Sequence, residues 1–310
     1  MKKVIYLFIY LISSSIFFFG CSKDDDNSSL KSPEYESISG KYNVLGNSTY
    51  SSIELGASGN YIIVKSTASN RSLLEKSNIS FSSAFSKKSS VVSNIRKSRS
   101  EKDSSDNGVI FGTYTVNEDG SINLEGFGTL VITYNGSSVT NITLTPTNGT
   151  AITLNVEKGD TYENSELTNK LCRTWNMVSI SEKEYDGTGK LLYDVEGTFN
   201  IKKQTWSWNL KVDELGWGEP SDGSYDLSQI LFSKSGTYLV YYTDKTALVR
   251  NWKWKDKSSN ILYYKEIEDA DYDEDNWTLL SFSGNRVAFS EKYSDSEGRW
   301  ESSTVLEAAD

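Results

Sequence analysis

The chain has 310 residues, enough for one to three domains, and a formal net charge of −10 at neutral pH. This acidity argues against nucleic acid as a partner. The chain contains no histidine and two cysteines, which excludes a Ser-His-Asp triad, a His-ligated zinc site and a framework of several disulfides.

Residues 1–20 have the features of a bacterial export signal. Lys2 and Lys3 give a positive start, and an almost wholly apolar run follows up to Phe19. The run is a little short for a membrane-spanning helix, which needs about 20 residues, whereas it fits the apolar region of a signal peptide. An uncleaved N-terminal anchor is the alternative. The small residue before Cys21 favours a signal that is removed at that point.

The residues around Cys21 resemble the lipobox of bacterial lipoproteins. The stretch "FFGC" keeps the small residue and the cysteine, while phenylalanines replace the usual residues before them. The following "CSKDDD" resembles the export signal of Bacteroidota-type surface lipoproteins. The resemblance implies that Cys21 is acylated, with palmitate-type chains held in the outer membrane. It also implies a location on the exterior face of that membrane, and the residues it assigns to this export are Lys23, Asp24, Asp25 and Asp26.

Residues 21–37 are expected to form a flexible acidic tether, because the acidic, Ser-rich stretch 22–32 cannot bury a core. Strand signals dominate from residue 38 to residue 158. Apolar and polar residues alternate through 130–156, and Asn-Gly turns interrupt the alternation at 135–136 and 148–149. This pattern predicts antiparallel, up-and-down strands with short connections. The Ser-rich, basic segment 66–107 is expected to be a mobile insertion within this domain.

An internal repeat divides the chain into two similar domains. "SIELGASGNYIIV" begins at Ser52 and "QILFSKSGTYLVY" begins at Gln229, and Tyr114 corresponds to Trp252 further along. A unit of over a hundred residues is too long for a solenoid. The repeat therefore predicts one domain over 38–158 and a second over 163–308. Helical spacing in 166–171 predicts a short helix at the start of the second domain.

These residues resemble the lipocalin-like domains of Bacteroidota lipoproteins. Lipocalins begin with Gly-x-Trp; Gly40-Lys41-Tyr42 keeps the glycine, and Arg173-Thr174-Trp175 keeps the tryptophan. The resemblance implies an all-β fold of two tandem antiparallel barrels, each with about eight strands. A pair of immunoglobulin-like sandwiches is the alternative, against which the missing Cys-Trp-Cys pattern counts.

Tryptophans in the second domain are the candidate ligand-binding residues. Trp206 and Trp208 share one face if "QTWSWN" is a strand, and Trp217 follows shortly after. They lie in a stretch, 204–220, that the first repeat lacks, and insertions often carry function. The alternative is ordinary packing, which we expect for Trp252 and Trp254.

The acidic stretch 266–277 invites a calcium interpretation. An EF-hand loop beginning at Asp269 needs glycine at its sixth position and glutamate at its twelfth, where Glu274 and Leu280 stand. We therefore expect a solvated loop, and we predict no metal and no cofactor.

Three classes of function remain. The first, which we predict, is a surface-anchored lipoprotein without catalytic activity that binds a small apolar or glycan ligand. The second is an accessory outer-membrane protein that makes protein–protein contacts. The third is a hydrolase that uses two carboxylates, which requires a pair about 5–10 Å apart in a cleft.

Overall fold

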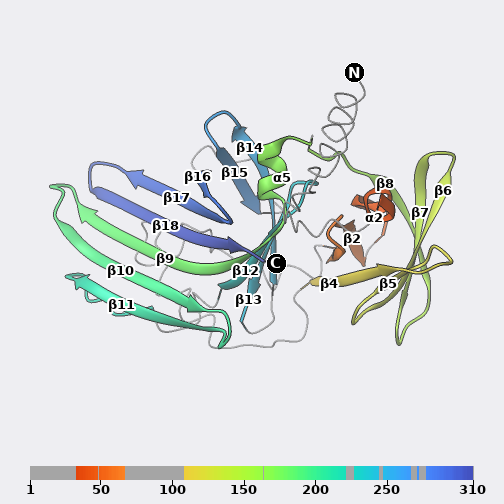
Figure 1. The fold of residues 1–310 in the computed structure, drawn as a ribbon, viewed down its shortest axis with the longest axis horizontal. Helices are drawn as coiled ribbons and strands as arrows, with labels where there is room; N and C mark the ends of the chain where they lie inside the picture. The colour runs from red at the N-terminus through yellow and green to blue at the C-terminus, as the bar shows by residue number, and fades with distance from the viewer. Residues whose placement is uncertain are drawn as a thin grey trace, which may run out of the picture. The chain divides into compact units, whose positions relative to one another are not determined.

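The computed structural model describes residues 33–47, 49–66, 108–162, 164–220, 227–243, 247–266, 271 and 277–309 (Figure 1). The expected signal peptide, lipid-bearing Cys21 and the export residues Lys23 to Asp26 lie outside these residues. The expected insertion beyond Ser66 and most of the acidic loop 266–277 also lie outside the described residues. Among the described residues, no helix is both long and apolar enough to cross a bilayer.

The first half of the chain folds into a closed antiparallel barrel of eight strands. Each strand pairs with the next, and β1 also pairs with β8 to close the ring. Its strands are β1 (Gly40–Leu45), β2 (Tyr50–Leu55), β3 (Asn60–Lys65), β4 (Val109–Val116), β5 (Ile122–Leu124), β6 (Gly128–Asn135), β7 (Ser138–Pro146) and β8 (Ile152–Lys158).

The second half forms another eight-stranded barrel, which β9 and β18 close, and it carries two additional strands. The barrel strands are β9 (Thr174–Asp186), β12 (Leu227–Phe232), β13 (Thr237–Tyr242), β14 (Ala247–Asp256), β15 (Ile261–Glu266), β16 (Trp277–Ser283), β17 (Arg286–Ser294) and β18 (Gly298–Ala308). The additional strands are β10 (Leu191–Asn200) and β11 (Thr205–Asp213). The prediction of an all-β fold with two tandem antiparallel barrels is confirmed.

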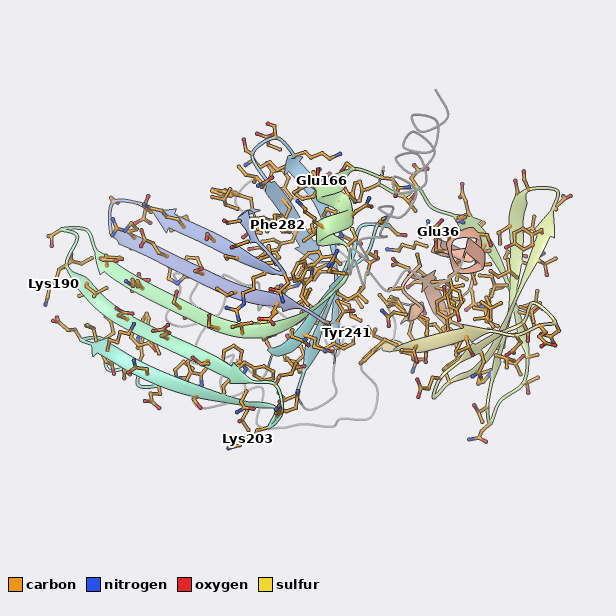
Figure 2. The ribbon with its side chains drawn as sticks, in the orientation of Figure 1. Glu36, Glu166, Lys190, Lys203, Tyr241 and Phe282 are labelled. Atoms are coloured by element: carbon orange, nitrogen blue, oxygen red, sulfur yellow. The ribbon has the colours of Figure 1, made fainter. Side chains whose placement is uncertain are left out.

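The strands β10 and β11 form a hairpin that extends the wall of the second barrel. The first residues of β9 pair with β12, and its later residues, 179–185, pair with β10. Strand β18 pairs along nearly all of β9, so β17, β18, β9, β10 and β11 lie side by side as a curved sheet (Figure 1). Lys190 and Lys203, in the turns before and after β10, mark the two ends of that strand (Figure 2).

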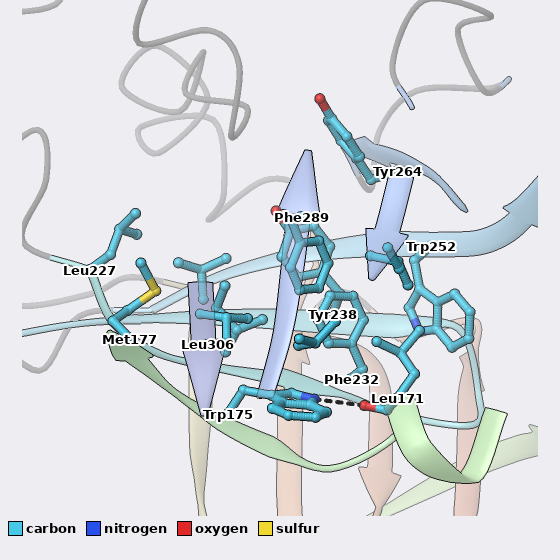
Figure 3. Packing of buried hydrophobic residues seen from close by; sticks show 14 of the residues in the cluster. Leu171, Trp175, Met177, Leu227, Phe232, Tyr238, Trp252, Tyr264, Phe289 and Leu306 are labelled. Carbon is cyan, nitrogen blue, oxygen red and sulfur yellow. Dashed lines mark hydrogen bonds between the residues drawn. The ribbon is translucent and has the colours of Figure 1, made fainter. Parts of the chain in front are cut away.

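Each barrel is preceded by a six-residue helix whose last residue accepts a hydrogen bond from an aromatic side chain of the first strand. Helix α5 (Glu166–Leu171) is the predicted helix, and Ser165 caps its N-terminus by accepting a hydrogen bond from the Thr168 amide. The Trp175 indole donates to the Leu171 carbonyl at 2.8 Å (Figure 3). In the first barrel the Tyr42 hydroxyl donates to the carbonyl of Ile38, the last residue of α2 (Pro33–Ile38).

Helix α2 corrects one prediction. Residues 33–37 were expected to belong to the flexible tether, and this is wrong because they form α2. The physical reason is packing: the Tyr35 ring stacks on Tyr114 with centroids 5.1 Å apart, and Ile38 packs against the first core. The prediction rested on the composition of 22–32, a stretch that contains neither Tyr35 nor Ile38.

The repeat found in the sequence is also a repeat of structure. Gly59 and Gly236 both have positive φ, +84° and +77°, a conformation that glycine adopts without strain. The Gly59 carbonyl accepts from the Tyr114 amide at 2.7 Å, and the Gly236 carbonyl accepts from the Trp252 amide at 2.8 Å. The two halves therefore share turns and backbone hydrogen bonds as well as an alternation of side chains.

Alternating residues give each barrel a separate apolar core. Tyr114 lies in the first core, and its hydroxyl donates to the Gly56 carbonyl at 2.9 Å. Trp252 takes the equivalent place in the second core, fully buried, with its indole donating to the Ser233 carbonyl at 3.0 Å. Trp254 is partly buried at the edge of the same cluster, so core packing accounts for both tryptophans.

Candidate functional site

Trp206 and Trp208 form a stacked pair on β11. Their ring centroids are 5.3 Å apart and the rings are inclined by 17°. Both rings are partly buried against the second core, and the Trp206 indole donates to the Leu227 carbonyl at 3.0 Å. The sequence prediction that the two rings share one face is confirmed.

A glycine on the neighbouring strand leaves the space that the Trp208 ring occupies. Gly197 on β10 lies directly opposite Trp208, and a Cβ atom at Gly197 would come within 2.4 Å of the ring. Phe199, two residues along β10, contacts Trp206 with centroids 5.2 Å apart. The absence of a side chain at Gly197 therefore lets the Trp208 ring lie across β10.

Trp217 occupies a different part of the same sheet. The Asp213 carboxylate accepts hydrogen bonds from the Trp217 and Gly218 amides, which fixes the turn after β11. The Trp217 ring packs against Tyr193, with centroids 5.2 Å apart. Tyr193 and Gly197 are four residues apart on β10, or about 13 Å. The three predicted tryptophans are thus spread along the sheet, with only Trp206 and Trp208 stacked together.

A buried polar cluster inside the second barrel was missed by the sequence prediction. Arg250 on β14 is 1% exposed and Glu291 on β17 is 7% exposed. Glu291 lies on the same face as Val287 and Phe289, which belong to the core, because alternate residues of a strand share a face. The other buried polar side chains of this cluster are Tyr264, Thr278 and Ser302.

The first barrel fills the same positions with glycine and apolar side chains. The repeat matches Tyr61 with Tyr238 and Tyr114 with Trp252, and the strand registers extend this match around both barrels. The resulting pairs are Arg250 with Gly112, Tyr264 with Leu124, Thr278 with Leu130, Glu291 with Leu144 and Ser302 with Ile152. The barrel architecture therefore does not require polar residues at these five places.

The Arg250 position shows this difference most clearly. In the first barrel a Cβ atom at Gly112 would lie 2.9 Å from the Tyr61 ring and 3.2 Å from the Glu125 carbonyl oxygen. No side chain fits there without a shift of its surroundings. The second barrel instead accommodates a complete arginine opposite Tyr238, the counterpart of Tyr61.

A second buried carboxyl shares the face of Glu291. Ser302 lies opposite both Glu291 on β17 and Glu182 on β9, so the three side chains form one row. Glu182 is 2% exposed. Two strand spacings separate the two glutamates, which is about 10 Å along the sheet.

Burial dominates the electrostatics of Glu291. Removal from water raises the pKa of its carboxyl to about 8, although the Tyr264 hydroxyl and the Arg250 guanidinium oppose this rise. Neither carboxyl oxygen has a hydrogen-bond partner of ordinary geometry among the described residues. At neutral pH the group is therefore mainly the neutral acid, which can both donate and accept a hydrogen bond.

The described residues offer no other chemical centre that we can assign. They include no group of three or more Asp, Glu or Cys side chains arranged to hold a metal ion. Cys172 is a free cysteine that packs against the second core, and burial raises the pKa of its thiol well above the usual range. The thiol is therefore protonated at neutral pH and a poor nucleophile.

The alternation of residues along the strands indicates the polar cluster, although the local composition does not. Charged residues in "FSEKYS" and "LVRNWK" are typical of exposed strand faces. Glu291 is two residues from Phe289, and Arg250 is two residues before Trp252, so period-two alternation assigns both to the core face. Extending the repeat to Gly112 and Leu144 would also have identified these positions.

Comparisons with known proteins do not identify the chain. No family model matches it, and no curated protein matches it. Among solved structures, it was matched to a Nostoc punctiforme protein of the DUF3598 family, whose function is unknown. The two are 8% identical, and the match covers 90% of this chain and 100% of that one at a TM-score of 0.15. A score this low supports no inference about this chain.

Proposed function

We propose that the protein is a non-catalytic, surface-anchored lipoprotein whose second barrel binds one small ligand, largely apolar or glycan in nature. The observation that carries this proposal is the polar interior of the second barrel at positions that are glycine or apolar in the first. A buried polar group destabilises a fold unless it is hydrogen-bonded. A binding role explains why Arg250 and Glu291 occupy positions where the same architecture accepts glycine and leucine.

The barrel and its tryptophans supply the remaining parts of a binding site. A barrel of eight strands has room for one small ligand when side chains do not fill it. Trp206 and Trp208 add a wide aromatic surface on the sheet that continues the barrel wall. Aromatic rings of this size suit an apolar body or the apolar face of a sugar.

The proposed cellular location follows from the sequence resemblance. Acylation of Cys21 would hold the protein at the outer membrane, and Lys23 with the acidic residues after it would direct it to the exterior. The two repeats resemble the lipocalin-like domains of Bacteroidota lipoproteins, and this resemblance agrees with a location at the outer membrane. No cofactor and no nucleic acid enter the proposal.

The buried glutamates bear on the hydrolase alternative. Their spacing of about 10 Å falls at the limit of what a carboxylate pair requires. The chain also has no histidine, the usual general base near neutral pH, and no other feature marks the two glutamates as a catalytic pair. We therefore retain the non-catalytic proposal; sugar released from an oligosaccharide by the purified protein would contradict it.

Replacing Trp206 or Trp208 with alanine is expected to weaken ligand binding at least 10-fold, because each change removes one of the two stacked rings. The mature chain would be screened by thermal shift against oligosaccharides, fatty acids and haem. A probe present at 100 times its Kd should stabilise the wild type by about 2.7 kcal/mol. Tyr134→Ala, at a half-exposed tyrosine of the first barrel, is the matched control and should bind normally. A screen in which no probe stabilises the wild type would contradict the proposal.

Replacing Cys21 with serine is expected to release the protein from the membrane fraction. The thioether link to the acyl chains needs the cysteine sulfur, and several chains on one residue give stable anchoring. Fractionation and uptake of labelled palmitate would measure the change. Protease treatment of intact cells would show whether the wild type faces the exterior. Equal membrane association of wild type and variant, without acyl label in either, would refute the anchor.

A further inference from the structure

Two buried polar groups on one face of the second barrel have no hydrogen-bond partner of ordinary geometry among the described residues. One is the Glu291 carboxyl, and the other is the indole N–H of Trp300 on β18. Both side chains are 7% exposed. Buried polar atoms in folded proteins nearly always meet a partner from the protein, from water or from a ligand, so each of these groups needs an explanation.

The two groups are neighbours on the sheet. Glu291 pairs with Ser302, and Trp300 lies two residues from Ser302 on the same strand, so Glu291 and Trp300 are diagonal neighbours on one face. Cα atoms in such positions are about 7–8 Å apart, and long side chains reach across that distance. The Glu291 carboxyl can accept a hydrogen bond and the Trp300 indole N–H can donate one. A single ligand group that both donates and accepts, such as a hydroxyl, would satisfy the two together.

We infer that the second barrel recognises a neutral oligosaccharide, one hydroxyl of which donates to Glu291 and accepts from the Trp300 indole. This inference rests on the proposed function and names its ligand class. A ligand ammonium group would meet the buried Arg250 guanidinium close to Glu291. An aliphatic chain would leave both polar groups unsatisfied, at a cost typical of buried unpaired groups.

The breadth of the sheet favours a ligand of several sugar rings. Trp208 lies opposite Gly197, Gly197 opposite Ile180 on β9, and Ile180 opposite Thr304 on β18. Glu291 is on β17, one strand further, so four strand spacings separate β11 from β17. That is about 19 Å along the sheet. A ligand that stacks on Trp208 and bonds to Glu291 is therefore extended.

The inference is tested by calorimetry on the mature chain with cellohexaose, maltohexaose and xylohexaose, and with palmitate as the apolar probe. At least one hexasaccharide is expected to bind. Trp300→Phe, which keeps an aromatic ring and removes the N–H, should weaken that binding about 5–10-fold. Glu291→Leu, the residue of the first barrel, should weaken it more than 10-fold. Glu291→Gln retains a donor and an acceptor and should change the affinity less than threefold.

The possible failures are distinguishable. Palmitate binding that Trp206→Ala abolishes, and that neither Trp300→Phe nor Glu291→Leu affects, would overturn the inference and leave the proposed function intact. No binding of any probe would overturn both. Sugar binding that is unchanged in the variants would show that a buried water satisfies the two groups, which also overturns the inference. The ¹⁵N-indole resonance of Trp300 gives a second readout, because it should shift on addition of the bound sugar.

Discussion

Replacing Trp252 with alanine will lower the unfolding free energy of the second barrel by about 3–5 kcal/mol, as large-to-small changes of buried aromatic residues do. The ring is fully buried and contacts Phe232, Tyr162 and Trp254, with centroids 5.9, 4.8 and 5.4 Å away. The change also removes the hydrogen bond that the Ser233 carbonyl accepts from the indole N–H. In a domain of about 150 residues this loss lowers Tm by on the order of 10 °C.

Two matched variants separate burial from aromatic character. Trp254→Ala removes a partly buried ring, whose indole donates to the Thr168 hydroxyl at 3.2 Å, and should cost clearly less. Trp252→Tyr installs the residue of the first barrel, where Tyr114 donates to Gly56, and should recover part of the loss. Urea denaturation of the mature chain, followed by circular dichroism, measures all three. Equal losses for Trp252→Ala and Trp254→Ala would show that the indole of Trp252 does not anchor the core.

The barrels could be predicted because their information is local or repeated. Alternation in 130–156 and the Asn-Gly turns specify hairpins, since each turn lies between strands that are adjacent in the sequence. Because Tyr61 matches Tyr238 in the repeat, the same strand prediction then applies to the second half. Among the described residues, the first barrel has no counterpart of the hairpin β10–β11, so nothing in the first half could indicate where it attaches to β9.

The site was harder to predict because its contacts are long-range. The stacked pair Trp206 and Trp208 follows from alternation within one strand, and it was predicted. The distance of Trp217 from that pair depends on the Asp213 turn and on Tyr193, which sequence spacing does not reveal. Arg250 on β14 and Glu291 on β17 are about forty residues apart in the sequence, and only barrel closure brings them to one interior.

The stability of the second barrel is expected to fall as the pH rises from about 5 to about 8. Unfolding returns the pKa of Glu291 from about 8 to its ordinary value of 4.5. Between these values the folded state binds a proton that the unfolded state does not, so a rise in pH favours unfolding. The slope reaches at most about 1.4 kcal/mol per pH unit for one proton. Below pH 4.5 both states are protonated, and above pH 8 both are ionised, so the effect is confined to this window.

Few other groups compete in the same window. The chain has no histidine. Hydrogen bonds from neighbouring side chains and amides hold the pKa values of the exposed carboxyls Asp186 and Asp256 below their usual range, so their effect on stability belongs to more acidic pH. The groups that face Glu291 are Arg250, Tyr264 and Glu182, together with the uncharged Thr278 and Ser302. The guanidinium of Arg250 stays protonated throughout.

Glu291→Gln is therefore the decisive variant, because the amide keeps the shape of the side chain and cannot ionise. Urea denaturation of wild type and variant at pH 5, 6, 7 and 8 should give nearly equal stability at pH 5 and a growing advantage of the variant above it. If the stabilities of wild type and variant instead changed in parallel with pH, Glu291 would be ionised or solvated in the folded barrel. That result would contradict the neutral acid assigned to Glu291 at pH 7, and the titration obtains it without any ligand.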